Sequence, residues 1–148
     1  MKRREVLGLL GGLFGLGALL SGAPAHAGQR GAGKAAADYA KCAKACNDCM
    51  ATCQACTKHC EAMIKAGTKG HETTQKLSAD CADICAAAAK ICNRQGPMTV
   101  AICAICARAC ESCGAACAKY PDMKPMQDCV KSCKVCAAAC HDMVKALQ

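Results

Sequence analysis

Positions suited to burial recur every three or four residues along most of the chain, and turn-forming residues interrupt this rhythm three times. Alternating steps of three and four keep side chains on one face of a helix. The pattern predicts four helices, which span about Ala35 to Ala66, about Glu72 to Arg94, Pro97 or Met98 to just before Tyr120-Pro121, and between Asp122 and Pro125 to the C-terminus. The connections are short, so neighbouring helices are expected to be antiparallel. The sequence therefore predicts an all-α, antiparallel up-down-up-down four-helix bundle.

The breaks between the first three segments hold residues that end helices. Gly67-Thr68-Lys69-Gly70 follows the first segment, and Gln95-Gly96-Pro97 follows the second. In the second break we expect a glycine cap at Gly96, followed by a proline that cannot continue the helix. Alanine is frequent inside the segments, and glycine is absent from their interiors apart from Gly114, which favours helix over strand.

Cysteine is the residue that repeats on the predicted inner faces, and this row of positions is termed the cysteine seam. Its members are Cys42, Cys46, Cys49, Cys53, Cys56, Cys60, Cys81, Cys85, Cys92, Cys103, Cys106, Cys110, Cys113, Cys117, Cys129, Cys133, Cys136 and Cys140. Ala88 stands at the one skipped step in the second segment. The same spacing continues into Met63, Met126, Met143, His71, Thr74 and Ser78.

Large apolar residues are too few to form an ordinary core. A chain of this length normally buries a dense set of Leu, Ile and Phe side chains. Here the positions placed for burial hold mostly cysteine and alanine. We therefore expect a cysteine-lined core in which something other than hydrocarbon fills the middle.

Residues 1–27 have the layout of an export signal, with a basic start, a glycine-rich apolar run and small residues before Ala27. The Arg3-Arg4 pair predicts the twin-arginine route, which exports folded proteins. An ordinary secretory signal is the alternative, and the short, glycine-broken apolar run argues against a membrane anchor. We expect cleavage after Ala27, a flexible segment at 28–35, a metal-binding four-helix-bundle domain at 36–148, and a periplasmic location.

The charge pattern excludes some classes of partner. The formal net charge is +8, and losing Lys2, Arg3, Arg4 and Glu5 with the signal would leave +6. Basic residues are spread along the predicted helices, and the mature part has only two aromatic residues, both tyrosines. Nucleic-acid binding needs a basic patch with stacking rings, so we predict no nucleic-acid partner, and no membrane contact after signal cleavage. The sequence shows no pair of carboxylates and no nucleophile with a supporting histidine or aspartate, so it does not suggest an enzyme.

Three roles for the thiols are considered. Cysteine packs well as a small apolar residue, but 18 on the inner faces exceed what packing needs. A disulfide-reinforced structural or interaction bundle is the second role, and export to an oxidising compartment favours it. Neighbours at i and i+4 have Cβ atoms about 5–6 Å apart, too far for a disulfide, although bridges between facing helices remain open.

Metal binding is the third role and fits the even spacing best. Zinc and iron–sulfur sites need four ligands that converge on a point, and a regular seam predicts no discrete tetrahedra. Cu(I) is soft, seeks thiolates and accepts two or three ligands, so pairs such as Cys49 and Cys53 could clamp one ion and share sulfurs with the next. We predict many Cu(I) ions, approaching about one per cysteine. Sequestration of zinc or cadmium is the alternative.

Methionine and histidine gather at one predicted end of the bundle, which holds His59, Met63, His71, Met123 and Met126. Thioether and imidazole bind Cu(I) less tightly than thiolate, which suits an entrance. We take His59, Met63, His71 and Met126 as candidate metal ligands beside the cysteines.

At this point the chain resembles the four-helix-bundle copper storage proteins of the exported, twin-arginine type. The resemblance covers about residues 36–148 and rests on the seam, on HCEAM at 59–63 and on DCVKSCKVCAAACHDMV in the last helix. It implies a homotetramer of bundles, many Cu(I) ions on interior cysteines, a His/Met-lined mouth, and a role in supplying or buffering copper for a recipient cuproenzyme or copper chaperone. The loop IKAGTKGHETT lacks the further methionines that the resemblance implies, and His71 is a candidate substitute.

Overall fold

The computed structural model describes the backbone of residues 26–148 and the side chains from residue 35. Most of the predicted export signal, residues 1–25, lies outside the described residues. The described part holds four helices and no strand, namely α1 (His26–Lys65), α2 (Glu72–Asn93), α3 (Thr99–Cys117) and α4 (Lys124–Leu147). The predicted helices are therefore confirmed, with ends within about two residues except at the start of α1.

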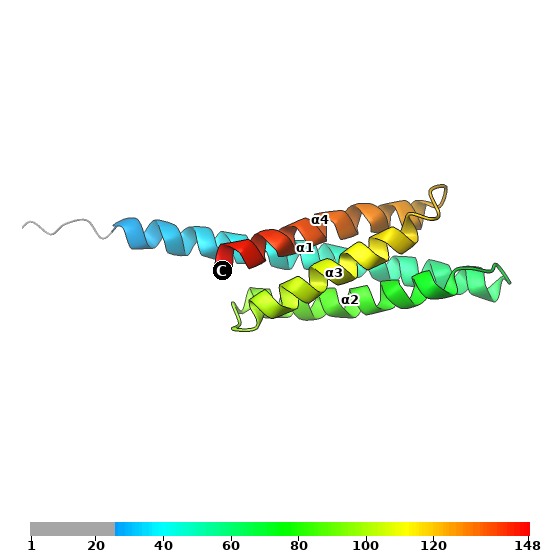
Figure 1. Ribbon diagram of the computed structural model, residues 1–148, viewed down its shortest axis with the longest axis horizontal. Helices are drawn as coiled ribbons and strands as arrows, with labels where there is room; N and C mark the ends of the chain where they lie inside the picture. The colour runs from blue at the N-terminus through cyan, green and yellow to red at the C-terminus, as the bar shows by residue number, and fades with distance from the viewer. Residues whose placement is uncertain (1–25) are drawn as a thin grey trace, which may run out of the picture.

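The helices form one elongated bundle with antiparallel neighbours (Figure 1). α1 packs against α2 and α4, and α3 packs against the same two helices from the other side. The α1–α2 and α3–α4 loops lie together at one end, termed the mouth end. The α2–α3 turn and the C-terminus lie at the opposite end, termed the far end. This is the predicted up-down-up-down topology.

The start of α1 differs from the prediction. The helix begins at His26 rather than near Ala35, so the segment 28–35 forms its first turns, and the flexibility expected of this segment stays a prediction. Extending an existing helix needs no new nucleus, and each added residue gains a backbone hydrogen bond. The alanines at 35–37 also favour helix, and together these effects outweigh the glycines before them.

Two helix ends show how the loops are fixed. After α1, Gly67 takes φ 79°, Thr68 N–H donates to Met63 O and Gly67 N–H donates to Ile64 O, which is a Schellman cap. After α2, the left-handed residue is Gln95, with φ 51°, and not Gly96 as predicted. Gly96 instead donates its N–H to Ile91 O, where a Cβ would lie 3.3 Å from the Ile91 side chain. Glycine therefore allows a close approach at this position, where a larger residue would require the Ile91 side chain to shift.

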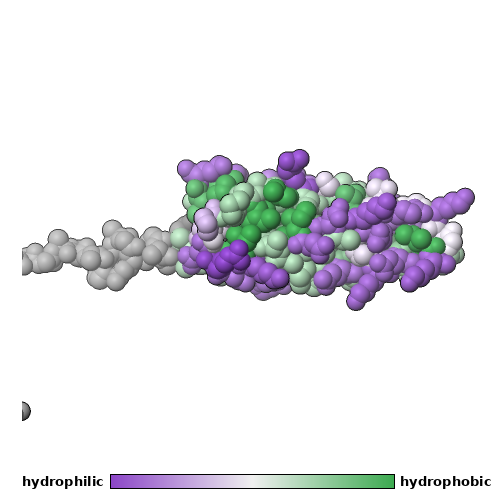
Figure 2. All heavy atoms as spheres, turned by 90° about the horizontal axis from the view of Figure 1, so that it is seen from below, coloured by the Kyte–Doolittle hydropathy of each residue, from purple (hydrophilic) through white to green (hydrophobic). Residues whose placement is uncertain are grey.

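The core is built from sulfur and small side chains, as predicted. All 18 cysteines are buried, together with Ala88 at the skipped step of α2 and with Thr74 and Ser78. Among the described residues, the Leu, Ile and Val side chains lie outside this core, and Ile105 and Val135 are half or more exposed. Figure 2 shows one face, on which hydrophilic side chains are widespread and an apolar patch lies nearer the far end. By length and composition alone α3 could cross a membrane, but this reflects the cysteines and alanines it buries in the bundle.

Candidate metal centre

Every predicted seam cysteine points into the bundle interior. Their exposed fractions are 0–1%, and all 18 are free thiols. The three-and-four spacing brings each row onto the buried face of its helix, and four such rows meet along the bundle axis. The structure therefore joins the predicted cysteines into one continuous thiol array.

The sulfur atoms of the array are in contact with one another. The shortest Sγ–Sγ distances are 3.5 Å, for Cys56 with Cys117 and for Cys92 with Cys103. Contacts at i and i+4 also occur, as between Cys49 and Cys53 at 3.8 Å. Most contacts nevertheless join different helices, so the clamps predicted within single helices are the smaller part of the array.

Groups of four sulfurs converge within the array, with all four Sγ atoms within 4.8 Å of one another. Five of these groups are Cys46/Cys106/Cys136/Cys140, Cys49/Cys53/Cys81/Cys133, Cys49/Cys81/Cys85/Cys110, Cys53/Cys113/Cys129/Cys133 and Cys85/Cys106/Cys110/Cys136. The prediction of no discrete tetrahedra did not foresee this convergence of four sulfurs, which arises because the helices face one another closely. The groups share members, however, so they are not discrete sites.

The spacing suits bound metal with little movement. With a metal–sulfur bond of about 2.3 Å, tetrahedral, trigonal and linear coordination separate sulfurs by about 3.8, 4.0 and 4.6 Å. The observed contacts of 3.5–4.0 Å match the first two geometries and fall short of the third by about 1 Å. Thiols could therefore hold ions after small side-chain rotations, without rearranging the helices.

Neighbouring thiols shift one another's proton affinity in opposite directions. Cys110 and Cys133 stabilise the thiolate of Cys49 through hydrogen bonds and lower its pKa, while the contacts of Cys110 with Cys106 and Cys133 raise the Cys110 pKa. At the mouth end, burial raises the pKa of the Cys60 thiol. Since every S–H···S contact needs one proton, the empty array is a network of shared protons that metal must displace.

The predicted histidines and methionines meet at the mouth end. His59 Nε2 lies 3.5 Å from Met123 Sδ, and the His59 ring meets the His71 ring edge-on at 6.4 Å between centroids. His71 is 1% exposed, and its ring stacks on Tyr120 at 4.4 Å with an interplanar angle of 19°. The last turns of α1 and the α1–α2 and α3–α4 loops therefore bring two imidazoles and a thioether together.

Methionine links this mouth to the thiol array. Cys56 Sγ donates to Met126 Sδ at 3.4 Å, and Met126 is fully buried. Met63 is half-buried on α1, four residues after His59. Whether His59, Met63, His71 and Met126 bind metal stays a prediction, and the structure adds Tyr120 to their surroundings. The even spacing that marked the seam could not mark Tyr120, since it lies at the α3–α4 loop.

The far end is different. Met143 is buried at the end of the seam, but Met98 is 60% exposed. His141 Nε2 lies 2.8 Å from a carboxylate oxygen of Glu111, and both side chains face solvent. The far end therefore lacks, among the described residues, a comparable gathering of imidazole and thioether side chains.

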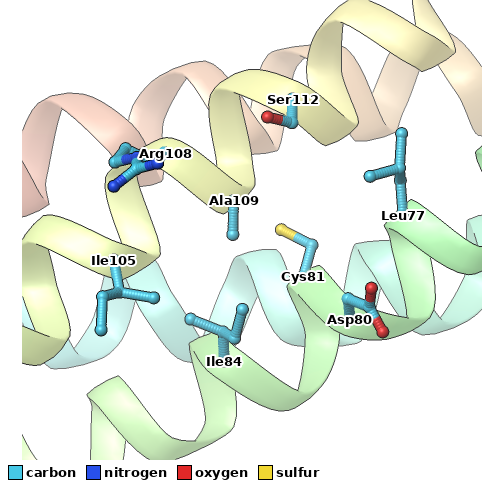
Figure 3. Close-up of a pocket in the computed structure, with 8 residues that line it drawn as sticks. All are labelled: Leu77, Asp80, Cys81, Ile84, Ile105, Arg108, Ala109 and Ser112. Atoms are coloured by element: carbon cyan, nitrogen blue, oxygen red, sulfur yellow. The ribbon is translucent and has the colours of Figure 1, made fainter.

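A groove of about 340 Å³ between α2 and α3 comes near the array from the side (Figure 3). Leu77, Ile84 and Ile105 line it, with Asp80 and Arg108 on opposite walls. The Cys81 side chain reaches from α2 toward Ala109 of α3 at its floor. Cys81 itself stays buried, so the groove approaches the array without opening it to solvent.

These features define a class of protein, a four-helix bundle whose core is a thiol array suited to soft metal ions. The model of the copper storage protein family matches residues 35–145. The chain therefore belongs to the copper storage protein family, which confirms the family resemblance seen in the sequence, while the exported, twin-arginine type stays a prediction.

Relatives of known structure share the fold. Apo copper storage protein 3 from Bacillus subtilis is 38% identical, with a TM-score of 0.62, over 70% of this chain and 96% of its own. A cytosolic copper storage protein from Streptomyces lividans, solved with five coppers, is 26% identical, with a TM-score of 0.70, over 76% of this chain and 97% of its own. The cysteine-rich protein YhjQ of Bacillus subtilis is 41% identical over 80 residues, which are 53% of this chain and 65% of that relative's length.

Proposed function

We propose that this chain stores and buffers many Cu(I) ions as thiolate complexes inside the bundle. The observation that carries the proposal is the thiol array, in which 18 buried free cysteines form overlapping four-sulfur groups. Structures of the Streptomyces lividans relative are described with five coppers and with 10 copper equivalents. Sharing of sulfurs between groups allows more ions than separate four-ligand sites would hold.

Binding is ligand exchange and proton release, without catalysis. Each entering ion leaves its carrier ligands and bonds to thiolates, whose protons pass to solvent. A Cu(I) ion for each thiolate leaves the interior nearly neutral, which makes a full array tolerable in a buried core. We therefore propose a storage protein that is not an enzyme.

Cu(I) enters at the mouth end in this proposal. His59, Met63, His71 and Met126 act as weaker ligands that pass ions to Cys56 and Cys60, and Met123 assists His59 at 3.5 Å. The Met126–Cys56 contact supports a direct transfer from thioether to thiol. His71 takes the place of the loop methionines that this chain lacks.

Location, assembly and partners form the rest of the proposal. The Arg3-Arg4 pair and the run that follows support twin-arginine export to the periplasm, in contrast to the cytosolic Streptomyces relative. We propose a homotetramer that supplies a cuproenzyme or copper chaperone. Replacing Arg3 and Arg4 by lysine should keep a reporter fused to residues 1–27 in the cytoplasm, and continued export would exclude the twin-arginine route.

Anaerobic titration of the reduced protein with Cu(I), against a chromogenic Cu(I) chelator, tests the storage function. We expect more than about ten tightly bound ions per chain. Saturation at one or two ions would refute storage. A variant with the four α4 cysteines replaced by alanine is the matched control, since it should keep the helices and lose capacity in proportion.

Zinc or cadmium sequestration is a second candidate, because the sulfur contacts of about 3.8 Å also fit tetrahedral coordination. A competition titration separates the metals, and zinc that resists displacement by Cu(I) would favour the alternative. Thiol counting on anaerobically purified protein tests the disulfide-reinforced bundle. Storage requires nearly all 18 thiols to be free.

A further inference from the structure

The His71 imidazole is held in an unfavourable place. Its Nδ1 atom is buried without a hydrogen-bond partner, the one such side-chain nitrogen or oxygen among the described residues. His71 occupies the N-cap of α2, yet its ring makes no capping hydrogen bond. A buried polar atom without a partner is costly, so the ring would gain by turning toward water. Something must hold it inside.

Tyr120 supplies that restraint from the other loop of the mouth end. Its ring stacks on the His71 ring, and its hydroxyl donates to Gly70 O at 2.6 Å. Gly70 N–H in turn donates to a Glu72 carboxylate oxygen at 3.0 Å. Gly70 has φ 94°, and a Cβ there would lie 3.6 Å from the Tyr120 hydroxyl. The stack fixes the plane of the imidazole, and the hydroxyl fixes the loop that carries it.

We propose that Tyr120 is a positioning residue that keeps the His71 Nδ1 lone pair inside the mouth as a ligand for incoming Cu(I). The proposal rests on the storage function argued above. An empty ligand atom that is already buried and oriented binds without the cost of ordering, which favours capture of the first ion. The unsatisfied nitrogen then gains its partner when the metal arrives.

The transfer step conserves charge and oxidation state. The bond from Cu(I) to a carrier ligand breaks as the imidazole nitrogen donates its lone pair, with the ring proton on the other nitrogen. A seam thiol next loses its proton to solvent and its thiolate displaces the imidazole. Copper remains Cu(I) throughout, and His71 returns to its starting state.

Stopped-flow uptake of the first equivalent of Cu(I) from a chromogenic chelate tests the proposal on the reduced mature protein. Tyr120→Leu removes both the stack and the hydroxyl, and should slow uptake about tenfold. Tyr120→Phe keeps the stack and should lie between that variant and the wild type. His71→Ala should slow uptake at least as much as Tyr120→Leu. Final copper capacity should be unchanged in Tyr120→Leu and Tyr120→Phe.

The double variant Tyr120→Leu/His71→Ala separates positioning from a general structural role. If Tyr120 acts through His71, the double variant is no slower than His71→Ala alone. The proposal is overturned if the double variant is slower than His71→Ala by the full effect of Tyr120→Leu. It is also overturned if Tyr120→Leu takes up copper at the wild-type rate. Tyr39→Leu is the matched control, because Tyr39 packs against the core on α1, outside the mouth end, and its loss should leave first-ion uptake unchanged.

A second measurement keeps the test independent of copper. His71 should react with diethyl pyrocarbonate slowly in the wild type and several-fold faster in Tyr120→Leu, as mass spectrometry would resolve. Equal protection in both proteins contradicts the restraint. Failure of the storage function would show differently, as a wild-type protein that binds only one or two ions whatever the state of Tyr120.

Discussion

Loading the empty protein with Cu(I) should release nearly one proton per ion. The thiols are the ligands in the proposed complex, and a thiol must lose its proton to bind. The structure fixes how many protons are available, because all 18 cysteines are buried and free. Among the described buried side chains none is lysine or arginine, so no fixed cation inside the bundle could stabilise many thiolates before copper arrives.

The sulfur contacts set the lower bound on proton release. The net effect of neighbouring thiols lowers the pKa in seven cysteines, namely Cys42, Cys49, Cys81, Cys106, Cys113, Cys129 and Cys136. If all seven were ionised beforehand, full loading at one ion per thiol would release about eleven protons. If none were ionised, it would release about eighteen. Repulsion between close thiolates favours the upper value, since seven charges in one core would be severely destabilising.

A pH-stat titration at pH 7 measures the release directly. Acetonitrile-stabilised Cu(I) is added anaerobically to the reduced protein, and the base needed to hold the pH is recorded per ion. We expect between about 0.6 and 1 proton per ion, nearer to 1. A ratio below about one half would mean that the core is largely thiolate before loading, and would refute the shared-proton description. Titration of a variant without the four α4 cysteines controls for copper bound elsewhere.

Three further predictions follow from burial in the array. Ser78→Cys places a nearly isosteric thiol at a fully buried seam position, and should raise copper capacity by about one ion in the chelator titration. Cys49→Ala/Cys53→Ala affects three of the five named sulfur groups, and should lower copper capacity by at least about two ions. The same variant should lower the unfolding free energy of the apo-protein, measured in urea, by about 2 kcal/mol. Because burial raises the Cys60 pKa above its ordinary 9.0, that thiol stabilises the fold below pH 9, and the urea midpoint of the apo-protein should fall as pH rises beyond it.

The fold could be predicted because one signal dominates the sequence. Cysteine at three-and-four spacing marks the buried face of every helix, and short breaks leave few topologies for four such helices. The seam positions that hold another residue follow the same three-and-four spacing, since Ala88, Thr74 and Ser78 are buried at the positions that the spacing predicts. The left-handed residue after α2 was missed by one position, because glycine usually takes that place and here Gln95 does.

The mouth could be predicted only in part. Spacing placed His71 on the inner face, but it could not show that Tyr120 stacks on it from a loop about fifty residues away. Contacts of this kind depend on how two loops meet, and no local pattern records them. The four-sulfur groups were missed for a similar reason, because a single helix shows the rows of thiols but not the distance between facing rows.

The sulfur distances explain how one fold can serve both the empty and the loaded protein. Thiols at 3.5–4.0 Å are in ordinary contact, so the apo core is packed like that of other bundles, with sulfur in place of methyl groups. Metal coordination, with sulfurs about 3.8–4.6 Å apart, requires the sulfur atoms to move by about 1 Å or less. Side-chain rotation can supply that while α1 and its neighbours keep their places. Large aliphatic side chains would fill the same volume but could not give way to metal, which is a physical reason for a core so poor in Leu, Ile and Phe.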